Sequence, residues 1–97
     1  MNKTIPINLI DVQVKDLTGT RIELENLHQI ISNHLYKVAQ TIPVSDAVRE
    51  LYYGKEVDVD QAQIKEMLMI SSGIFAPIIS ISLTEYLTEK LNNLITE

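Results

Sequence analysis

The pattern of apolar residues changes its period once along the chain, and this change restricts the fold to strands followed by helices. Apolar and polar residues alternate over residues 10–15 and again over residues 20–24. A period of two is typical of a strand that buries one face. Between these segments lies Asp-Leu-Thr-Gly at 16–19, which suits a type I turn closed by a left-handed glycine. We therefore predict a β-hairpin over residues 10–24.

After residue 26 the apolar residues recur in steps of three and four, which predicts amphipathic helices. The first helix is expected to open with a capping box of Asn26 and Gln29 and to run to about residue 40. Pro43 suits the first turn of a second helix, because its missing amide proton costs nothing there. Gly54 is then its expected C-terminal cap.

The same signals predict two more helices in the second half of the chain. Residues 56–58 form an acidic segment that we interpret as a loop, and Asp58 with Gln61 forms a second expected capping box. Gly73 ends this third helix, and Pro77 begins a fourth. The apolar stripe of the fourth helix is expected to contain Ile79, Leu83, Tyr86, Leu87, Leu91 and Leu94.

These elements together predict an α+β fold, with an N-terminal β-hairpin packed on a bundle of about four helices. Residues 1–9 contain Pro6, which cannot donate to a ladder, so they are expected to form an edge strand or an arm. A length of 97 residues suits one domain. We predict a single domain, 1–97, with the helical part at 26–95.

Charge and composition argue against several classes of function. Thirteen acidic residues against eight basic ones give a net charge of −5, and the basic residues are scattered, which disfavours nucleic-acid binding. No cysteine is present, so thiol chemistry is excluded. The chain shows neither a signal-peptide pattern nor an apolar run long enough to span a membrane. We expect a cytoplasmic protein that binds neither nucleic acid nor membrane.

The polar residues do not form a recognisable catalytic, cofactor or metal motif. His28 and His34 are six positions apart, which places them on opposite sides of a helix and prevents shared metal binding. The three glycines are isolated, so no phosphate-binding loop is present. The acidic residues near position 56 lack the spacing of a calcium loop. We predict a non-enzyme without cofactor or metal.

The third and fourth helices carry more apolar residues than one core-facing stripe requires. A small domain has one core to fill, and surplus apolar surface marks a partner or self-association site. We expect Ile78, Ile81 and Met69 to contribute to such an interface. Tyr53 joins them because tyrosine suits contact surfaces. The predicted function is protein–protein interaction in assembly or host inhibition, with a homodimer as the expected assembly.

An alternative is a protein that binds a small, nucleotide-type ligand. Such a ligand needs convergent polar groups, for which His28, Arg49 and Tyr52 are the candidates. A pocket lined by Arg and Tyr would favour this alternative, whereas a flat apolar face would favour a protein partner.

The order of these motifs resembles a group of small bacteriophage and prophage proteins. The resemblance rests on the Asp-Leu-x-Gly hairpin at 14–22, the helix at 27–38, the segment 45–60, Ile-Lys-Glu at 64–66 and the apolar helix from Pro77. It covers about residues 12–87 and departs at Leu51, where isoleucine is usual. The group has no assigned enzymatic activity, so the resemblance implies a phage-related setting and no particular mechanism.

Overall fold

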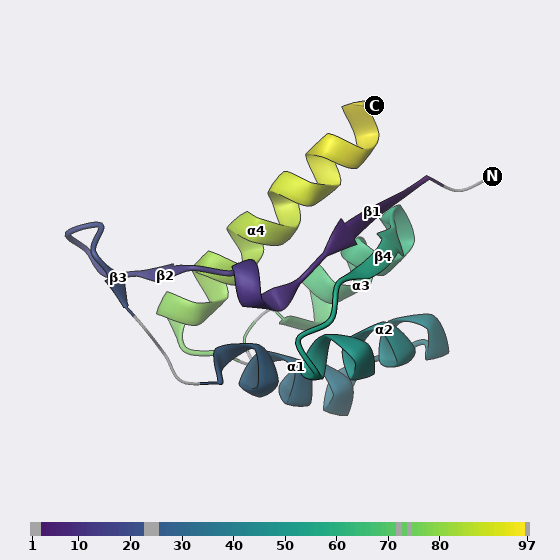
Figure 1. Cartoon of the computed structure of the whole chain (residues 1–97), viewed down its shortest axis with the longest axis horizontal. Coiled ribbons are helices and arrows are strands. Elements are labelled where there is room, and N and C mark those ends of the chain that lie inside the picture. The colour runs from purple at the N-terminus through teal and green to yellow at the C-terminus, as the bar shows by residue number, and fades with distance from the viewer. Residues whose placement is uncertain (1–2, 23–25, 72, 74, 97) are drawn as a thin grey trace.

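The fold is α+β, as the sequence predicts (Figure 1). The computed structural model describes residues 3–22, 26–71, 73 and 75–96. The strands are β1 (Thr4–Ile7), β2 (Val14–Lys15), β3 (Arg21–Ile22) and β4 (Val57–Asp60), and a short 3-10 helix, η1 (Leu9–Asp11), follows β1. The helices are α1 (Leu27–Val38), α2 (Ile42–Tyr52), α3 (Gln61–Ser71) and α4 (Pro77–Thr96).

The predicted turn at 16–19 is confirmed. The Gly19 amide donates to the Asp16 carbonyl at 3.0 Å, and Gly19 has a φ of +84°, a conformation in which a Cβ would be strained. The Asp16 carboxylate accepts bonds from the Thr18 amide, the Thr18 hydroxyl and the Thr20 amide. The hairpin ladder is confined to β2 and β3, and residues 23–25 lie outside the described residues.

The prediction that the first strand of this hairpin begins at Ile10 is wrong. Residues 9–11 form η1, and the Asn8 side chain caps it by accepting a bond from the Ile10 amide. Leu9 is 1% exposed and Ile10 is 52% exposed. Leu9 is therefore the residue that packs in the core, and Ile10 does not lie on the buried face that the alternation predicted for it.

Residues 57 and 58 of the acidic segment that we interpreted as a loop belong to β4. This strand pairs antiparallel with β1, which aligns Thr4 with Asp60 and Ile7 with Val57. The prediction of an edge strand near the N-terminus is therefore confirmed, and Pro6 occupies it as expected. The partner strand was missed because it lies about fifty residues away in sequence and is only four residues long.

Both predicted capping boxes are wrong. The box predicted at Asp58 and Gln61 forms instead two residues later, at Asp60 and Gln63. The Gln63 amide donates to the Asp60 carboxylate and the Asp60 amide donates to the Gln63 side chain, each at 2.8 Å. Strand β4 continues to Asp60 and α3 begins at Gln61, so Asp60, and not residue 58, directly precedes the helix. At α1, Asn26 is left-handed, and its carbonyl, not its side chain, accepts the Gln29 amide.

The predicted positions of the two helix-starting prolines are confirmed. Pro43 lies in the first turn of α2, and Pro77 is the first residue of α4. Gly54 ends α2 with a φ of +78°. Helix α1 ends at Val38, before the expected residue 40, because the amides of residues 40 and 41 donate to the Glu66 carboxylate.

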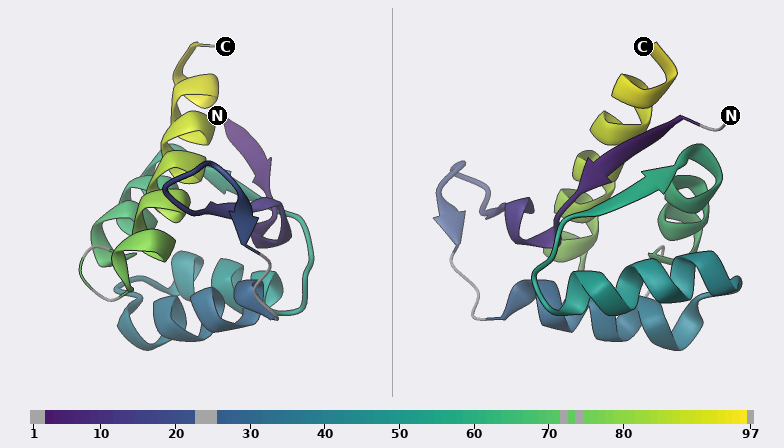
Figure 2. Two further views of the ribbon diagram at one scale, coloured as in Figure 1. Left: turned by 90° about the vertical axis from the view of Figure 1, so that its left-hand side faces the viewer. Right: turned by 45° about the vertical axis from the view of Figure 1, so that its right-hand side comes forward.

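The core is one cluster to which every helix contributes. Helices α1 and α2 lie side by side, while α4 rises away from them along α3 (Figure 2). The predicted stripe of α4 is confirmed, since Leu83, Leu87 and Leu94 are buried and Ile79, Tyr86 and Leu91 are partly buried against the core. The hairpin strand β2 packs on α4 through the buried Val14. This packing sets the hairpin beside the N-terminal half of α4.

Candidate functional site

The hairpin and α4 form the walls of an open groove of about 760 Å³. We call it the acidic groove. Residues from η1 and β2 and from the turn after β2 line one side, and α4 lines the other. The full lining is Asp11, Gln13, Lys15, Asp16, Leu17, Gly19, Pro77, Ile78, Ile81, Ser82, Glu85, Tyr86 and Glu89.

The α4 wall follows helical spacing. Its side chains recur in steps of three and four from Ile78 through Ile81 and Glu85 to Glu89, so they share one face of the helix. This face points away from the core stripe that contains Leu83. Ile78 is 37% exposed and Ile81 is 59% exposed. The structure therefore places two of the predicted interface residues together, at one end of a face whose other end is acidic.

The opposite wall ends in an exposed apolar side chain. Leu17, in the turn between β2 and β3, has no shielding from solvent in the described structure. It lines the same groove as Ile78 and Ile81. Exposed apolar residues on both walls are suited to binding an apolar side chain of a partner. Such binding would remove apolar surface of both proteins from water.

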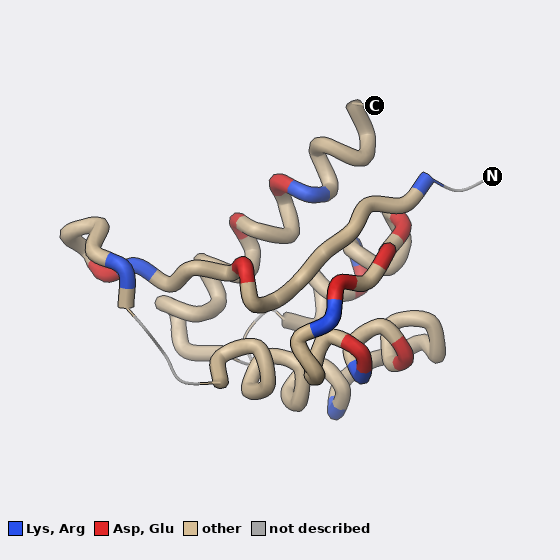
Figure 3. The backbone as a smooth tube through the Cα atoms, viewed as in Figure 1, with Lys and Arg blue, Asp and Glu red and all other residues tan. Residues whose placement is uncertain are grey.

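The charge of the groove is negative. Asp11, Asp16, Glu85 and Glu89 line it, against one cation, Lys15. Figure 3 shows these acidic positions along η1, the hairpin and α4. Arg49 forms an ion pair with Asp46 and Lys55 forms one with Glu50, so neither of these cations neutralises a carboxylate of the groove.

Two titratable groups of the groove have shifted pKa values. The hydrogen bond from the Thr18 hydroxyl, at 2.6 Å, lowers the pKa of Asp16 below its usual 3.8. Burial raises the pKa of Tyr86 above its usual 10.0, and the nearby charges of Asp11, Glu56 and Glu89 act in the same direction. Lys90 lies over the Tyr86 ring, 5.4 Å from its centroid. At neutral pH, Asp16 is thus ionised and Tyr86 is uncharged.

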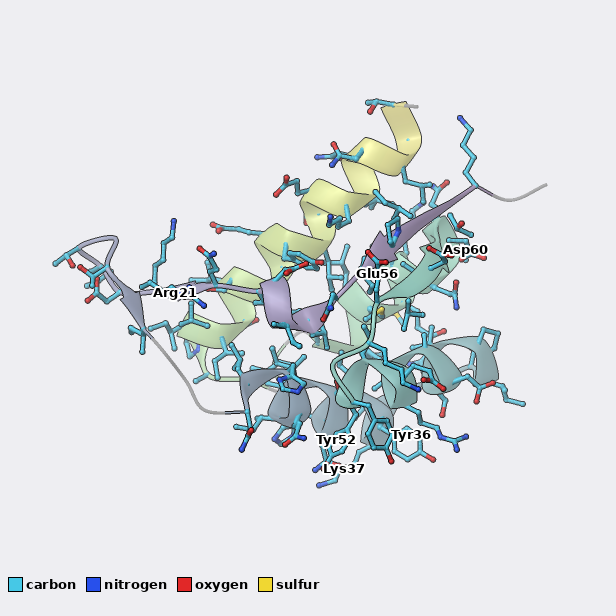
Figure 4. All side chains as sticks on the ribbon, viewed as in Figure 1. Arg21, Tyr36, Lys37, Tyr52, Glu56 and Asp60 are labelled. Carbon is cyan, nitrogen blue, oxygen red and sulfur yellow. The ribbon has the colours of Figure 1, made fainter. Side chains whose placement is uncertain are left out.

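A second, smaller cavity of about 170 Å³ lies between α1 and α2. Arg49, Tyr52 and Tyr53 line it from the α2 side, and the rings of the two tyrosines pack edge to face with their centroids 5.3 Å apart. Tyr36 and the buried Ser32 line it from α1, and the Ser32 hydroxyl has no hydrogen-bond partner among the described residues. Figure 4 labels Tyr36 and Tyr52 at the outer edge of this helix pair.

The remaining sequence-predicted residues lie elsewhere. His28 lines a third cavity, beneath the hairpin, together with Leu9 and Arg21, so the structure does not bring it into the cavity of Arg49 and Tyr52. Met69 is exposed on α3 and does not line the acidic groove. His34 meets the Phe75 ring edge to face, with centroids 5.4 Å apart.

Sequence reasoning missed the acidic half of the site. Glu85 and Glu89 continue the spacing of Ile78 and Ile81, and this continuation was a usable signal in the sequence. Asp11 and Leu17 carried no such signal, because only the packing of the hairpin on α4 brings them to the groove.

No group of three or more His, Cys, Asp or Glu side chains suited to a metal ion occurs in the part of the chain that the structure describes. Within residues 3–22, 26–71, 73 and 75–96, no helix is long and apolar enough to cross a membrane. Comparison with known proteins gives no match to a family model, a curated protein or a solved structure.

Proposed function

We propose that this chain is a non-enzymatic protein–protein interaction protein that binds its partner through the acidic groove. The observation that carries the proposal is the exposure of Ile78, Ile81 and Leu17 on facing walls of one groove. Large apolar side chains that are exposed on both walls of one groove can be desolvated together by one partner, and exposed apolar patches of this kind mark interaction sites. The proposal includes the phage-related setting and the cytoplasmic location, with assembly or host inhibition as the role.

The small-ligand alternative is less well supported. The cavity that holds Arg49 and Tyr52 has about 170 Å³, below the roughly 300–1,000 Å³ usual for drug-sized ligands. The acidic groove is large enough, but its carboxylates would repel the phosphates of a nucleotide. A nucleotide site needs sufficient volume and cationic groups in one place. Here the cavity with Arg49 is too small, and the large groove is acidic.

The homodimer predicted from Ile78 and Ile81 also fits less well than a different partner. A two-fold contact uses the same patch on both copies. It would place one net-negative groove against another, and like charges across an interface oppose association.

Site-specific photocrosslinking tests the proposal in the cells that make the protein. A photoreactive p-benzoylphenylalanine replaces Ile81 in one version and Ile95 in the control. Both side chains lie on α4 and have similar exposure, 59% and 56%, but Ile95 lies outside the acidic groove. We expect a discrete adduct with a second polypeptide from position 81 only. No adduct at position 81, or the same adducts from both positions, would contradict the proposal.

A further inference from the structure

The partner chemistry that fits the acidic groove is more specific than a protein of any kind. We propose that its occupant is a basic amphipathic helix of another protein, which inserts apolar side chains between Ile78, Ile81 and Leu17 and places Lys or Arg against the carboxylates. This inference rests on the proposed function. It adds the secondary structure and the charge of the partner.

Charge complementarity supports a basic occupant. Four carboxylates and one ammonium group line the groove, and the ion pairs that Arg49 and Lys55 form involve none of those carboxylates. The Asp16 carboxylate is held in place by three hydrogen bonds within the turn, so its charge is already oriented before a partner arrives. Preorganised charges of this kind steer an oppositely charged partner and fix its orientation.

The shape of the groove supports a helical occupant. Its α4 wall extends from Pro77 to Glu89, about 18 Å at the usual rise of a helix. The exposed Ile78 and Ile81 stand three positions apart and form a ridge, against which a second helix can pack its own ridge of apolar residues. An added strand fits less well, because β2 and β3 are each two residues long and offer few backbone partners.

A second copy of this chain is a poor source of that helix. None of the four helices carries more than one Lys or Arg, and α4 carries Glu85 and Glu89 beside its Lys90. The occupant must therefore come from a different protein.

Fluorescence anisotropy with the full chain and synthetic peptides tests the inference. The probe is a labelled helical peptide of about 15 residues, with leucine at helical spacing and lysine on its flanks. The control peptide has glutamate in place of lysine. We expect the lysine peptide to bind and the glutamate peptide not to bind. The affinity of the lysine peptide should fall as the salt concentration is raised to about 0.5 M. Equal binding of both peptides, or no binding of the lysine peptide, would overturn the inference.

Matched variants locate the binding. Ile81→Ser is expected to lower the affinity of the chain for the lysine peptide about tenfold, whereas Ile95→Ser should leave this affinity unchanged. Glu89→Gln is expected to lower the affinity for the lysine peptide about threefold. Asp58→Asn is the control, because it removes an exposed charge outside the groove. Equal effects of Ile81→Ser and Ile95→Ser would show nonspecific attraction to an acidic protein and would also overturn the inference.

Failure of the inference is distinguishable from failure of the proposed function. An adduct with another protein at position 81, without binding of the lysine peptide, would retain the interaction function and reject the basic helix. An adduct of twice the mass of this chain would place a second copy in the groove and reject the occupant proposed here.

Discussion

The backbone amide of Asn8 donates a hydrogen bond of 3.0 Å to the phenol oxygen of Tyr86, across 78 positions of sequence. The Asn8 side-chain amide in turn donates to the Gly54 carbonyl at 3.3 Å. The segment between β1 and η1 is thus tied to α4 on one side and to the end of α2 on the other. Since Tyr86 also lines the acidic groove, this bond helps to hold the α4 wall against the N-terminal segment.

Replacing Tyr86 with phenylalanine should lower the free energy of unfolding by about 1 kcal/mol at pH 7. The partly buried Asn8 amide would lose its acceptor, and a lost hydrogen bond of this kind has about that effect. Urea denaturation of wild type and Tyr86→Phe measures the difference. Unchanged stability would show that the bond contributes nothing to the folded state.

The same variant should show an alkaline signature. Burial raises the pKa of Tyr86 above 10.0, so the folded state favours the neutral phenol. Its contribution to stability is present below pH 10 and is lost as pH rises through the higher folded-state pKa. The stability difference between wild type and Tyr86→Phe should therefore shrink at about pH 11. A difference that stays constant would contradict the shifted pKa.

Asp60→Ala should destabilise the protein by about 1 kcal/mol, because it removes the side-chain acceptor that caps α3. Asp58→Ala is the matched control. Asp58 is an exposed carboxylate two positions earlier in β4, so its loss should change stability by less than about 0.5 kcal/mol. Chemical denaturation of both variants decides between the two candidate boxes. A larger effect at Asp58 would restore the sequence-based assignment.

Thr18→Val should raise the pKa of Asp16 back toward 3.8, because the Thr18 hydroxyl is the main cause of its lowering. A lowered folded-state pKa means that Asp16 contributes to stability above pH 3.8 and that this contribution is lost as pH falls through the folded-state value. Carbon-detected NMR titration of the Asp16 carboxyl measures the midpoint. Thr4→Val, at an exposed threonine in β1, should leave that midpoint where it is in wild type.

Substitutions on α4 should separate its two faces. Ile81→Asp places a charge on an exposed position and should cost less than about 1 kcal/mol, whereas Leu83→Asp buries a charge in the core and should prevent folding. Circular dichroism and thermal melting compare the variants. Loss of structure in Ile81→Asp would show that the groove face of α4 is part of the core.

Light scattering on the wild-type chain tests the assembly. The net-negative lining of the groove predicts a monomer at concentrations where a two-fold dimer through Ile78 and Ile81 would form. A dimer that Ile81→Asp converts to a folded monomer would instead support self-association through this face.

The sequence by itself determined the hairpin turn, two helix starts and the core stripe of α4, because each of these signals lies within one short segment. The turn at 16–19 was predicted from an aspartate and a glycine three positions apart. The bond from the Gly19 amide to the Asp16 carbonyl closes the turn, and Gly19 is left-handed. Pro43 and Pro77 marked helix starts through their own fixed backbone geometry. The core stripe of α4 followed from spacing alone, as the burial of Leu83 and Leu87 confirms.

Only the tertiary structure decided where distant segments meet. The pairing of Thr4 with Asp60 converted an acidic loop into β4, and that strand in turn moved the helix cap from Asp58 to Asp60. Because β4 continues to Asp60, α3 begins at Gln61, and the capping box forms between Asp60 and Gln63, two residues after the predicted one. The acidic groove arose in the same way. Leu17 and Glu89 lie 72 positions apart, and they share a site because the buried Val14 packs the hairpin against α4.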